Sequence, residues 1–183
     1  MSSSPFRRIL IPIDFTEDAD AAVHSGFEVD VQGTIVAVAP ASAKALQLAA
    51  GVIDEQGELC LVHATPTYEA ARVYGGAGMG VLGASDIAKV HDNAKAASLE
   101  VLDALAAHFA PDIAHTCVVR PGVALQVILD EAERFAAELV VIAASGRSRV
   151  ARFFLGSTAD RVIRQSPCPV MVVPAGLLGE GEK

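Results

Sequence analysis

Short apolar runs rich in isoleucine and valine recur along the chain, with helical patterns between them. Continuous runs of this kind indicate strands covered on both faces, because a sheet with one wet face would alternate apolar and polar residues. We interpret five runs as strands: Ile9–Ile13, Leu59–His63, Cys117–Val119, Leu139–Ala143 and Val170–Val173. Their alternation with helices predicts an α/β fold, a doubly wound sheet of about five parallel strands in one domain.

Apolar residues spaced three or four positions apart predict helices between these strands. The expected ranges are Ser42–Gly51, Ser85–Phe109, Val123–Ala137 and Ser157–Gln165. Ser42 is a candidate N-cap of the first helix, and Gly51 stands near its end. The inner stripe expected for the second helix consists of Val90, Ala94, Ala97, Val101, Leu102 and Leu105.

The segment 19–41 interrupts the alternation of strands and helices, and we interpret it as an insertion. Alternating residues over Phe27–Val31 and a second apolar run over Thr34–Val38 predict a hairpin that turns near Gln32–Gly33. The alternative is a short helix followed by an additional parallel strand, over Thr16–Phe27 and Thr34–Ala39. The glycine-rich stretch Tyr74–Ala84 predicts a loop, without the Gly-Lys-Ser/Thr of a phosphate-binding loop, and residues 175–183 predict a flexible tail.

Composition and charge exclude several classes of protein. A net charge of -8 disfavours nonspecific binding to nucleic acid or anionic membranes, and the absence of tryptophan disfavours a base-stacking surface. No apolar run is long enough to span a bilayer, and the first residues lack the pattern of a secretory signal. Cys60, Cys117 and Cys168 show no zinc-binding spacing, so we expect a reducing cytoplasm and no metal site.

The stretch that follows Leu139–Ala143 carries the strongest candidate for a binding site. In an open α/β sheet, ligands bind beyond the carboxyl ends of the strands. A helix that begins there at Gly156 offers free N–H groups, and the hydroxyls of Ser157 and Thr158 add donors, which favours a phosphate chain. The alternative is that Gly146 only turns the chain and that Ser157 only caps the helix.

Several motifs in order resemble the universal stress protein family. The family signature is Gly, two residues, Gly, nine residues, then Gly-Ser or Gly-Thr, and Gly146 with Gly156-Ser157 matches its later spacing. The stretch ILIPIDFTED, with Asp14, resembles the first strand of the family, and ADRVIRQSPCPVMVVP resembles its last helix and strand. The resemblance covers nearly the whole chain apart from 19–41 and the tail. It implies an ATP-binding, flavodoxin-like sheet, similar to that of adenine nucleotide alpha-hydrolases and usually dimeric through the last strand.

The resemblance also implies a role for individual residues toward ATP, or toward AMP or ADP, with or without Mg. The nucleoside end would meet Pro12, Asp14 and the backbone near His63 and Ala64. The ribose and phosphates would meet Ala143, Gly146, Arg147, Gly156, Ser157 and Thr158. For Asp14 the alternative role is a helix cap or turn former, and His63 is expected to be packed or solvent-facing rather than a base.

One departure concerns Ala143, where nucleotide-binding members of the family have glycine. If the position needs a positive φ, alanine costs about 1–2 kcal/mol, and if it needs only space, the methyl group crowds the ribose or phosphates. Five arginines near the site could attract a polyphosphate, although Arg161 and Arg164 are expected on a solvated helical face. They are Arg147, Arg149, Arg152, Arg161 and Arg164.

The sequence contains no recognisable Ser/His/Asp or Cys/His catalytic motif, and its histidines do not have the spacing of metal ligands. Asp130, Glu131 and Glu133 beside Arg134 predict the wet face of a helix. Without an evident general base, ATP suits a regulatory ligand better than a fuel, so hydrolysis would be slow at most. We therefore expect a cytoplasmic stress-response protein that binds an adenine nucleotide and forms a homodimer through Val170–Val173. The alternatives are a nucleotide-free dimeric interaction module and an adenylate-handling enzyme.

Overall fold

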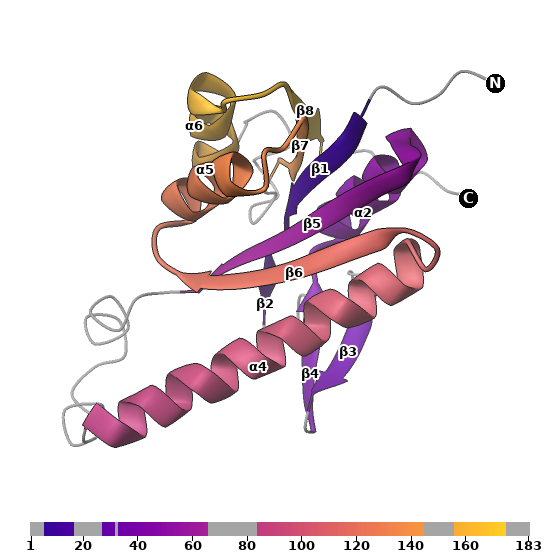
Figure 1. Ribbon diagram of the computed structural model, residues 1–183. Coiled ribbons are helices and arrows are strands. Elements are labelled where there is room, and N and C mark those ends of the chain that lie inside the picture. Colours follow the sequence, from indigo (N-terminus) through magenta and orange to yellow (C-terminus); the bar gives the residue numbers. More distant parts are fainter. Residues whose placement is uncertain (1–5, 17–26, 32, 66–83, 145–155, 175–183) are drawn as a thin grey trace, which may run out of the picture.

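The computed structural model describes residues 6–16, 27–31, 33–65, 84–144 and 156–174 (Figure 1). Its main sheet has five strands in the order β6-β5-β1-β7-β8, and all neighbouring strands in it run parallel. The strands are β1 (Phe6–Pro12), β5 (Ile53–Thr65), β6 (Ala114–Pro121), β7 (Leu139–Ala143) and β8 (Val170–Val173). The parallel α/β sheet expected from the apolar runs is confirmed.

The central strand β1 shows why continuous apolar runs were diagnostic. Ile9, Leu10 and Ile11 have no exposed surface. Ile9 and Ile11 belong to one hydrophobic cluster, whereas Leu10 belongs to a second cluster. Because successive side chains of a strand point to opposite faces, the sheet is covered on both sides.

Four helices of the described part of the chain provide that cover, two on each face. Residues of α2 (Pro40–Val52) and α4 (Ala84–Phe109) join the cluster that contains Ile9. Residues of α5 (Ala124–Arg134) and α6 (Ser157–Gln165) join the cluster that contains Leu10. Figure 1 shows α5 and α6 together on one side of the sheet and the long α4 on the other.

The inner stripe predicted for α4 is confirmed only toward the C-terminal end of that helix. Val101, Leu102 and Leu105 are buried, but Ala94 is exposed, so its assignment to the core was wrong. The physical reason is visible in Figure 1, where the first turns of α4 run out past the end of β6. No helix in the described part of the chain combines the length and apolarity needed to cross a membrane.

A second, antiparallel sheet has the order β2-β4-β3. Its strands are β2 (Phe15–Thr16), β3 (Glu28–Val31) and β4 (Thr34–Val38). The predicted hairpin is confirmed, because β3 pairs antiparallel with β4, and the alternative of an additional parallel strand is wrong. Asp30 Oδ1 accepts a hydrogen bond of 2.8 Å from Gly33 N, and Gly33 has φ +85, which glycine adopts without strain. Residues 17–26 and 32 lie outside the described residues.

The hairpin packs against the end of α4. The ring of Phe27 lies 4.9 Å from the ring of His108 and 5.2 Å from that of Phe109, measured between centroids. Val31 and Val36 are buried in the same cluster as the core residues of α4. The second sheet therefore extends one of the two cores of the main sheet.

The start of α2 differs from the prediction. The helix begins at Pro40 with Ala39 as its N-cap residue, so Ser42 is not the cap. Proline has φ preset for the first helical position and lacks the N–H that would go unpaired there. The Ser42 hydroxyl instead accepts a hydrogen bond of 3.3 Å from Asp14 N. Gly51 lies within the helix, which ends at Val52 immediately before β5.

Other element boundaries differ by a few residues at their polar ends. Strand β6 is longer than the apolar run that identified it, because its first residues are exposed but still paired with β5. Strand β5 begins earlier than expected, at Ile53, which pairs with Phe6 of β1, and it includes the polar residues before Leu59. Helix α5 ends at Arg134, before Ala136 adopts φ 49. The predicted loop over Tyr74–Ala84 lies outside the described residues except for Ala84, which begins α4. The predicted tail at 175–183 also lies outside them.

The wet face predicted for α5 is wrong for Glu131. This residue is 7% exposed, and the Oε2 of its side chain accepts a hydrogen bond of 2.8 Å from Arg120 Nε on β6. Arg134 Nη1 lies 3.7 Å from the same oxygen. A buried carboxylate is tolerated here because two guanidinium groups compensate its charge.

Candidate functional site

The strand order places a topological switch point between β1 and β7. From β1 the chain proceeds outward through β5 to β6 on one side, and it then returns to form β7 and β8 on the other side. The crossovers on either side of β1 and β7 therefore run in opposite directions, which is the switch point where open α/β sheets bind ligands. Pro12 ends β1 and Ala143 ends β7 at this edge.

The backbone of Asp14 is held firmly beyond the end of β1. Asp14 N donates to the Ser42 hydroxyl at 3.3 Å, and Asp14 O accepts from Ala39 N at 3.3 Å. Both partners belong to the start of α2, so this helix fixes the chain where it leaves the central strand. The side chain of Asp14 is half-buried at the same edge as Pro12.

His63 joins the ends of β5 and β1. Its Nδ1 lies 2.9 Å from Ile13 O, and a carbonyl oxygen only accepts, so Nδ1 carries the proton. Burial lowers the pKa of His63, against the opposing effects of this hydrogen bond and of the Asp14 charge. The imidazole is therefore neutral at pH 7 and half-buried, and its Nδ1–H links the end of β5 to the chain beyond β1. Ala64 follows it, half-buried and paired with Arg120 of β6.

Ala143 sits at its position without backbone strain. It is the last residue of β7 and pairs with Val173 of β8. Among the non-glycine residues that the structure describes, only Ala136 has a positive φ. Ala143 therefore does not adopt the left-handed conformation considered for it. The cost that such a conformation would impose on alanine is absent, and only the volume of the methyl group distinguishes this residue from glycine.

Helix α6 points its N-terminus toward the same edge. The helix ends at Gln165, and β8 begins at Val170 after a short link. A helix that feeds a parallel strand runs antiparallel to that strand, so α6 begins near the carboxyl ends of the strands. Its N-cap residue is Gly156, with φ -59 and ψ 146, and no side chain caps the helix. The reading of Ser157 as the cap is therefore wrong, because Ser157 is the first helical residue and is exposed.

Two of the predicted site residues, Gly146 and Arg147, lie outside the described residues, as do Arg149 and Arg152. Arg161 and Arg164 of α6 are exposed, as expected for a solvated face. Arg164 donates two hydrogen bonds of 3.1 Å to the Asp160 carboxylate. This pairing holds the pKa of Asp160 below its ordinary value.

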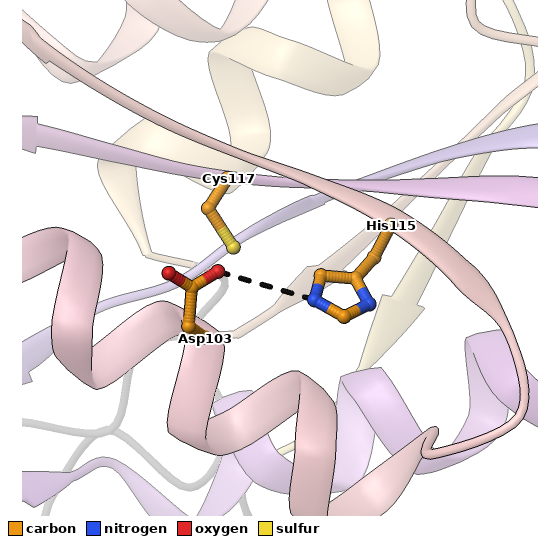
Figure 2. A group of neighbouring side chains, drawn as sticks. All are labelled: Asp103, His115 and Cys117. Atoms are coloured by element: carbon orange, nitrogen blue, oxygen red, sulfur yellow. Dashed lines mark ion pairs between the residues drawn. The ribbon is translucent and has the colours of Figure 1, made fainter.

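The structure also groups three side chains that the sequence analysis did not connect (Figure 2). Asp103 comes from α4, whereas His115 and Cys117 come from β6. A His-x-Cys pair on a strand is a signal that could have been noticed, because residues two apart share a face. Nothing in the sequence indicates that Asp103 lies opposite them. Burial raises the pKa of the Cys117 thiol, and its hydrogen bond to Asp103 raises it further.

Comparisons with known proteins identify the family. A universal stress protein of Methanocaldococcus jannaschii is 42% identical over 52 residues, a segment that spans 28% of this chain and 31% of that protein. Among solved structures, the hypothetical protein MJ0577 has a TM-score of 0.63 at 16% identity, with 92% of this chain and 95% of that chain covered.

Two further structures share the fold. UspA of Lactobacillus plantarum has a TM-score of 0.53 at 18% identity, covering 92% of this chain and 97% of that chain. A family member from Arabidopsis thaliana, solved with AMP bound, has a TM-score of 0.52 at 14% identity, covering 91% and 90%. The model of the universal stress protein family matches residues 5–174. This chain, with its five-stranded parallel sheet and glycine-initiated last helix, belongs to the universal stress protein family.

Proposed function

We propose that this protein binds an adenine nucleotide at the carboxyl ends of β1 and β7. The nucleotide would act as a regulatory ligand in a cytoplasmic stress response. The observation that carries the proposal is that α6 begins at the carboxyl ends of the strands, where the switch point between β1 and β7 lies. Free N–H groups and the positive end of the helix dipole attract phosphate oxygens. The AMP held by the Arabidopsis family member supports the class of ligand.

In this proposal the nucleoside end of the ligand lies near Pro12, Asp14 and the backbone of His63 and Ala64. A fixed Asp14 is suited to accept from ribose hydroxyls, because its backbone is held by Ser42 and Ala39. The polyphosphate of ATP, with or without Mg, extends toward the start of α6. The groups assigned to the ribose and phosphates are Ala143, Gly146, Arg147, Gly156, Ser157 and Thr158.

Replacement of Gly156 by valine tests this placement. Gly156 has φ -59 and ψ 146, a conformation open to any residue, so the side chain adds bulk without backbone strain. A branched side chain at the phosphate end should weaken ATP binding by at least about tenfold, or about 1.4 kcal/mol. The matched control is Gly51→Val, since Gly51 is exposed near the end of α2, at the opposite edge of the sheet.

Equilibrium dialysis with ATP, together with mass analysis of nucleotide released from freshly purified protein, gives the result. Retained adenine nucleotide and a selective loss of affinity in Gly156→Val support the proposal. Equal affinities of the two variants would put the phosphates elsewhere. A multiple-turnover phosphate-release assay distinguishes a regulatory ligand, turned over slowly at most, from an enzyme substrate.

A second candidate function is a nucleotide-free interaction module that assembles through β8. This strand is the last in the order of the main sheet, and Val170, Met171 and Val172 are only half-buried. Pairing with the same strand of a second copy would cover this edge. Absence of ATP binding at millimolar concentration, together with a dimer in solution, favours the module over the nucleotide-binding protein.

The dimer can be tested at Val172. Pro169 O accepts a hydrogen bond from Val140 N of β7, and Val173 O accepts one from Ala144 N just after that strand. By alternation, the N–H of Val172 points away from β7, toward the open edge. Proline is tolerated in edge strands but removes that donor. Val172→Pro should shift a wild-type dimer to a monomer in sedimentation experiments, and an unchanged dimer would assign the contact to another surface.

A further inference from the structure

A group of three side chains lies beside the edge strand β6, apart from the proposed nucleotide site (Figure 2). It consists of Asp103, His115 and Cys117. His115 and Cys117 occupy the first half of β6, whereas the nucleotide edge is at the other end of the strands. Being two residues apart, they project from the same face of β6 toward α4, where Asp103 meets them. The group therefore joins a helix to the outermost strand β6.

The donor atoms of the group already face one another. His115 Nε2 lies 3.9 Å from Asp103 Oδ1, and all three donor atoms lie within 4.8 Å of one another. Around a tetrahedral zinc ion, bond lengths of about 2.0–2.3 Å set donor atoms roughly 3.3–3.7 Å apart. Rotations that bring the donors about 1 Å closer are therefore enough, and the Asp103 side chain, 64% exposed, is able to make them.

The orientation of His115 matches that of a metal ligand. Its Nδ1 lies 3.3 Å from Ile113 O, and because a carbonyl oxygen only accepts, Nδ1 is the protonated nitrogen. The lone pair of the neutral ring is then on Nε2, the nitrogen that faces Asp103. Histidine ligands in metal sites commonly donate their second N–H to a backbone carbonyl in this way.

We propose that Asp103, His115 and Cys117 form a zinc-binding site, with the fourth position held by water. A carboxylate oxygen, an imidazole nitrogen and a thiolate sulfur are the three kinds of zinc donor, and the sulfur disfavours magnesium and calcium. The ion binds the Cys117 thiolate, so one thiol proton passes to solvent when the ion enters. Because the side chains of His115 and Asp103 are 29% and 64% exposed, the ion reaches the site from solution.

Titration of the chelator-treated full chain with Co²⁺ tests the proposal, because a cobalt–thiolate bond gives a charge-transfer absorption band that oxygen and nitrogen ligands do not. We expect one equivalent of Co²⁺ to produce this band and Zn²⁺ to displace it. Cys117→Ser should abolish the band. Asp103→Asn and His115→Gln should each weaken Zn²⁺ binding by at least about tenfold, since even the loss of an outer-shell partner costs about 10–100-fold.

Cys168→Ser is the matched control, because Cys168 is a second half-buried cysteine outside the group. It should retain the band and the affinity of the wild type. Far-UV circular dichroism checks that each variant folds, and if Cys117→Ser does not, the exposed Asp103→Asn decides the result alone. No saturable band in the wild type, or a band that survives Cys117→Ser and disappears in Cys168→Ser, would overturn the zinc site.

Discussion

Replacement of Gly57 by alanine should destabilise this protein, whereas the same replacement at Gly51 should not. A Cβ atom at Gly57 would lie 2.5 Å from Ile53 Cγ1 and 2.9 Å from the backbone oxygen of Arg7. Atoms do not approach so closely, so either β1 or the start of β5 must move. Gly57 lies next to the point where the register between β1 and β5 shifts, between the pairs Phe6–Ile53 and Arg8–Glu58.

The magnitude follows from the two environments. Extra atoms forced into a well-packed region cost about 1–3 kcal/mol, and we expect that loss for Gly57→Ala. At Gly51 nothing lies within 4 Å of the added Cβ. Alanine is the better helix former by up to about 1 kcal/mol, and roughly half of that is expected so near the end of α2.

Thermal unfolding followed by far-UV circular dichroism compares both variants with the wild type. In a chain of this size, 1 kcal/mol shifts Tm by about 2–4 °C, so Gly57→Ala should melt about 2–12 °C lower. Gly51→Ala should melt at the wild-type temperature or slightly above it. A Gly57→Ala protein as stable as the wild type would mean that β5 relaxes without cost, and the argument from the close contacts would be refuted.

Three further predictions concern other buried groups. Arg120→Ala should lower the free energy of unfolding by about 1–2 kcal/mol in urea titrations, because the buried Glu131 loses its partner at 2.8 Å. This cost stays below that of breaking a fully buried pair, because Arg120 is 44% exposed and Arg134 lies near the same carboxylate. Arg134→Ala should cost less than about 0.5 kcal/mol, and the reverse order of the two costs would contradict the assignment. Burial lowers the pKa of His63 below its ordinary 6.5, so its contribution to stability is complete above that pH and is lost as the unfolded chain binds the proton below it. His63→Gln should therefore reduce the fall in Tm between about pH 7.5 and about pH 5.5, and equal falls in both proteins would remove His63 as the cause. Burial raises the pKa of Cys60 to about 12, so iodoacetamide should modify Cys60 only after denaturation, and peptide mass spectrometry that finds it modified in the native protein would disprove this.

The main sheet was predictable from the sequence because burial on both faces leaves a signal in every residue of a strand. Ile9–Ile13 and Leu139–Ala143 are almost continuously apolar for this reason. The start of β5 carries no such signal, because a polar stretch separates Ile53 from Glu58, the two residues that pair with β1 there. Sequence patterns locate the buried centre of such a strand, but pairing determines its ends.

The parts of the site that could be predicted are those set by strand order and local motif. Gly156 directly precedes α6 as expected, but the role of Ser42 was missed because its hydroxyl accepts a hydrogen bond from Asp14 N, 28 residues away. Glu131 was assigned to the wet face for a similar reason, since its partner Arg120 lies on a different element. The convergence of Asp103 on β6 is likewise a matter of tertiary packing, which no local pattern contains.

The central position of β1 has a consequence for the synthesis of the protein. One side of β1 pairs with β5 soon after both have been made, but the other side pairs with β7, where Ile9 meets Leu139. The backbone N–H groups of Arg7 and Arg8 donate hydrogen bonds to the Glu138 carboxylate, which is synthesised 131 and 130 residues later. At about 5–20 residues per second, this separation corresponds to roughly 7–26 seconds of translation. During that interval the innermost strand of the finished protein is an open edge on the nascent chain.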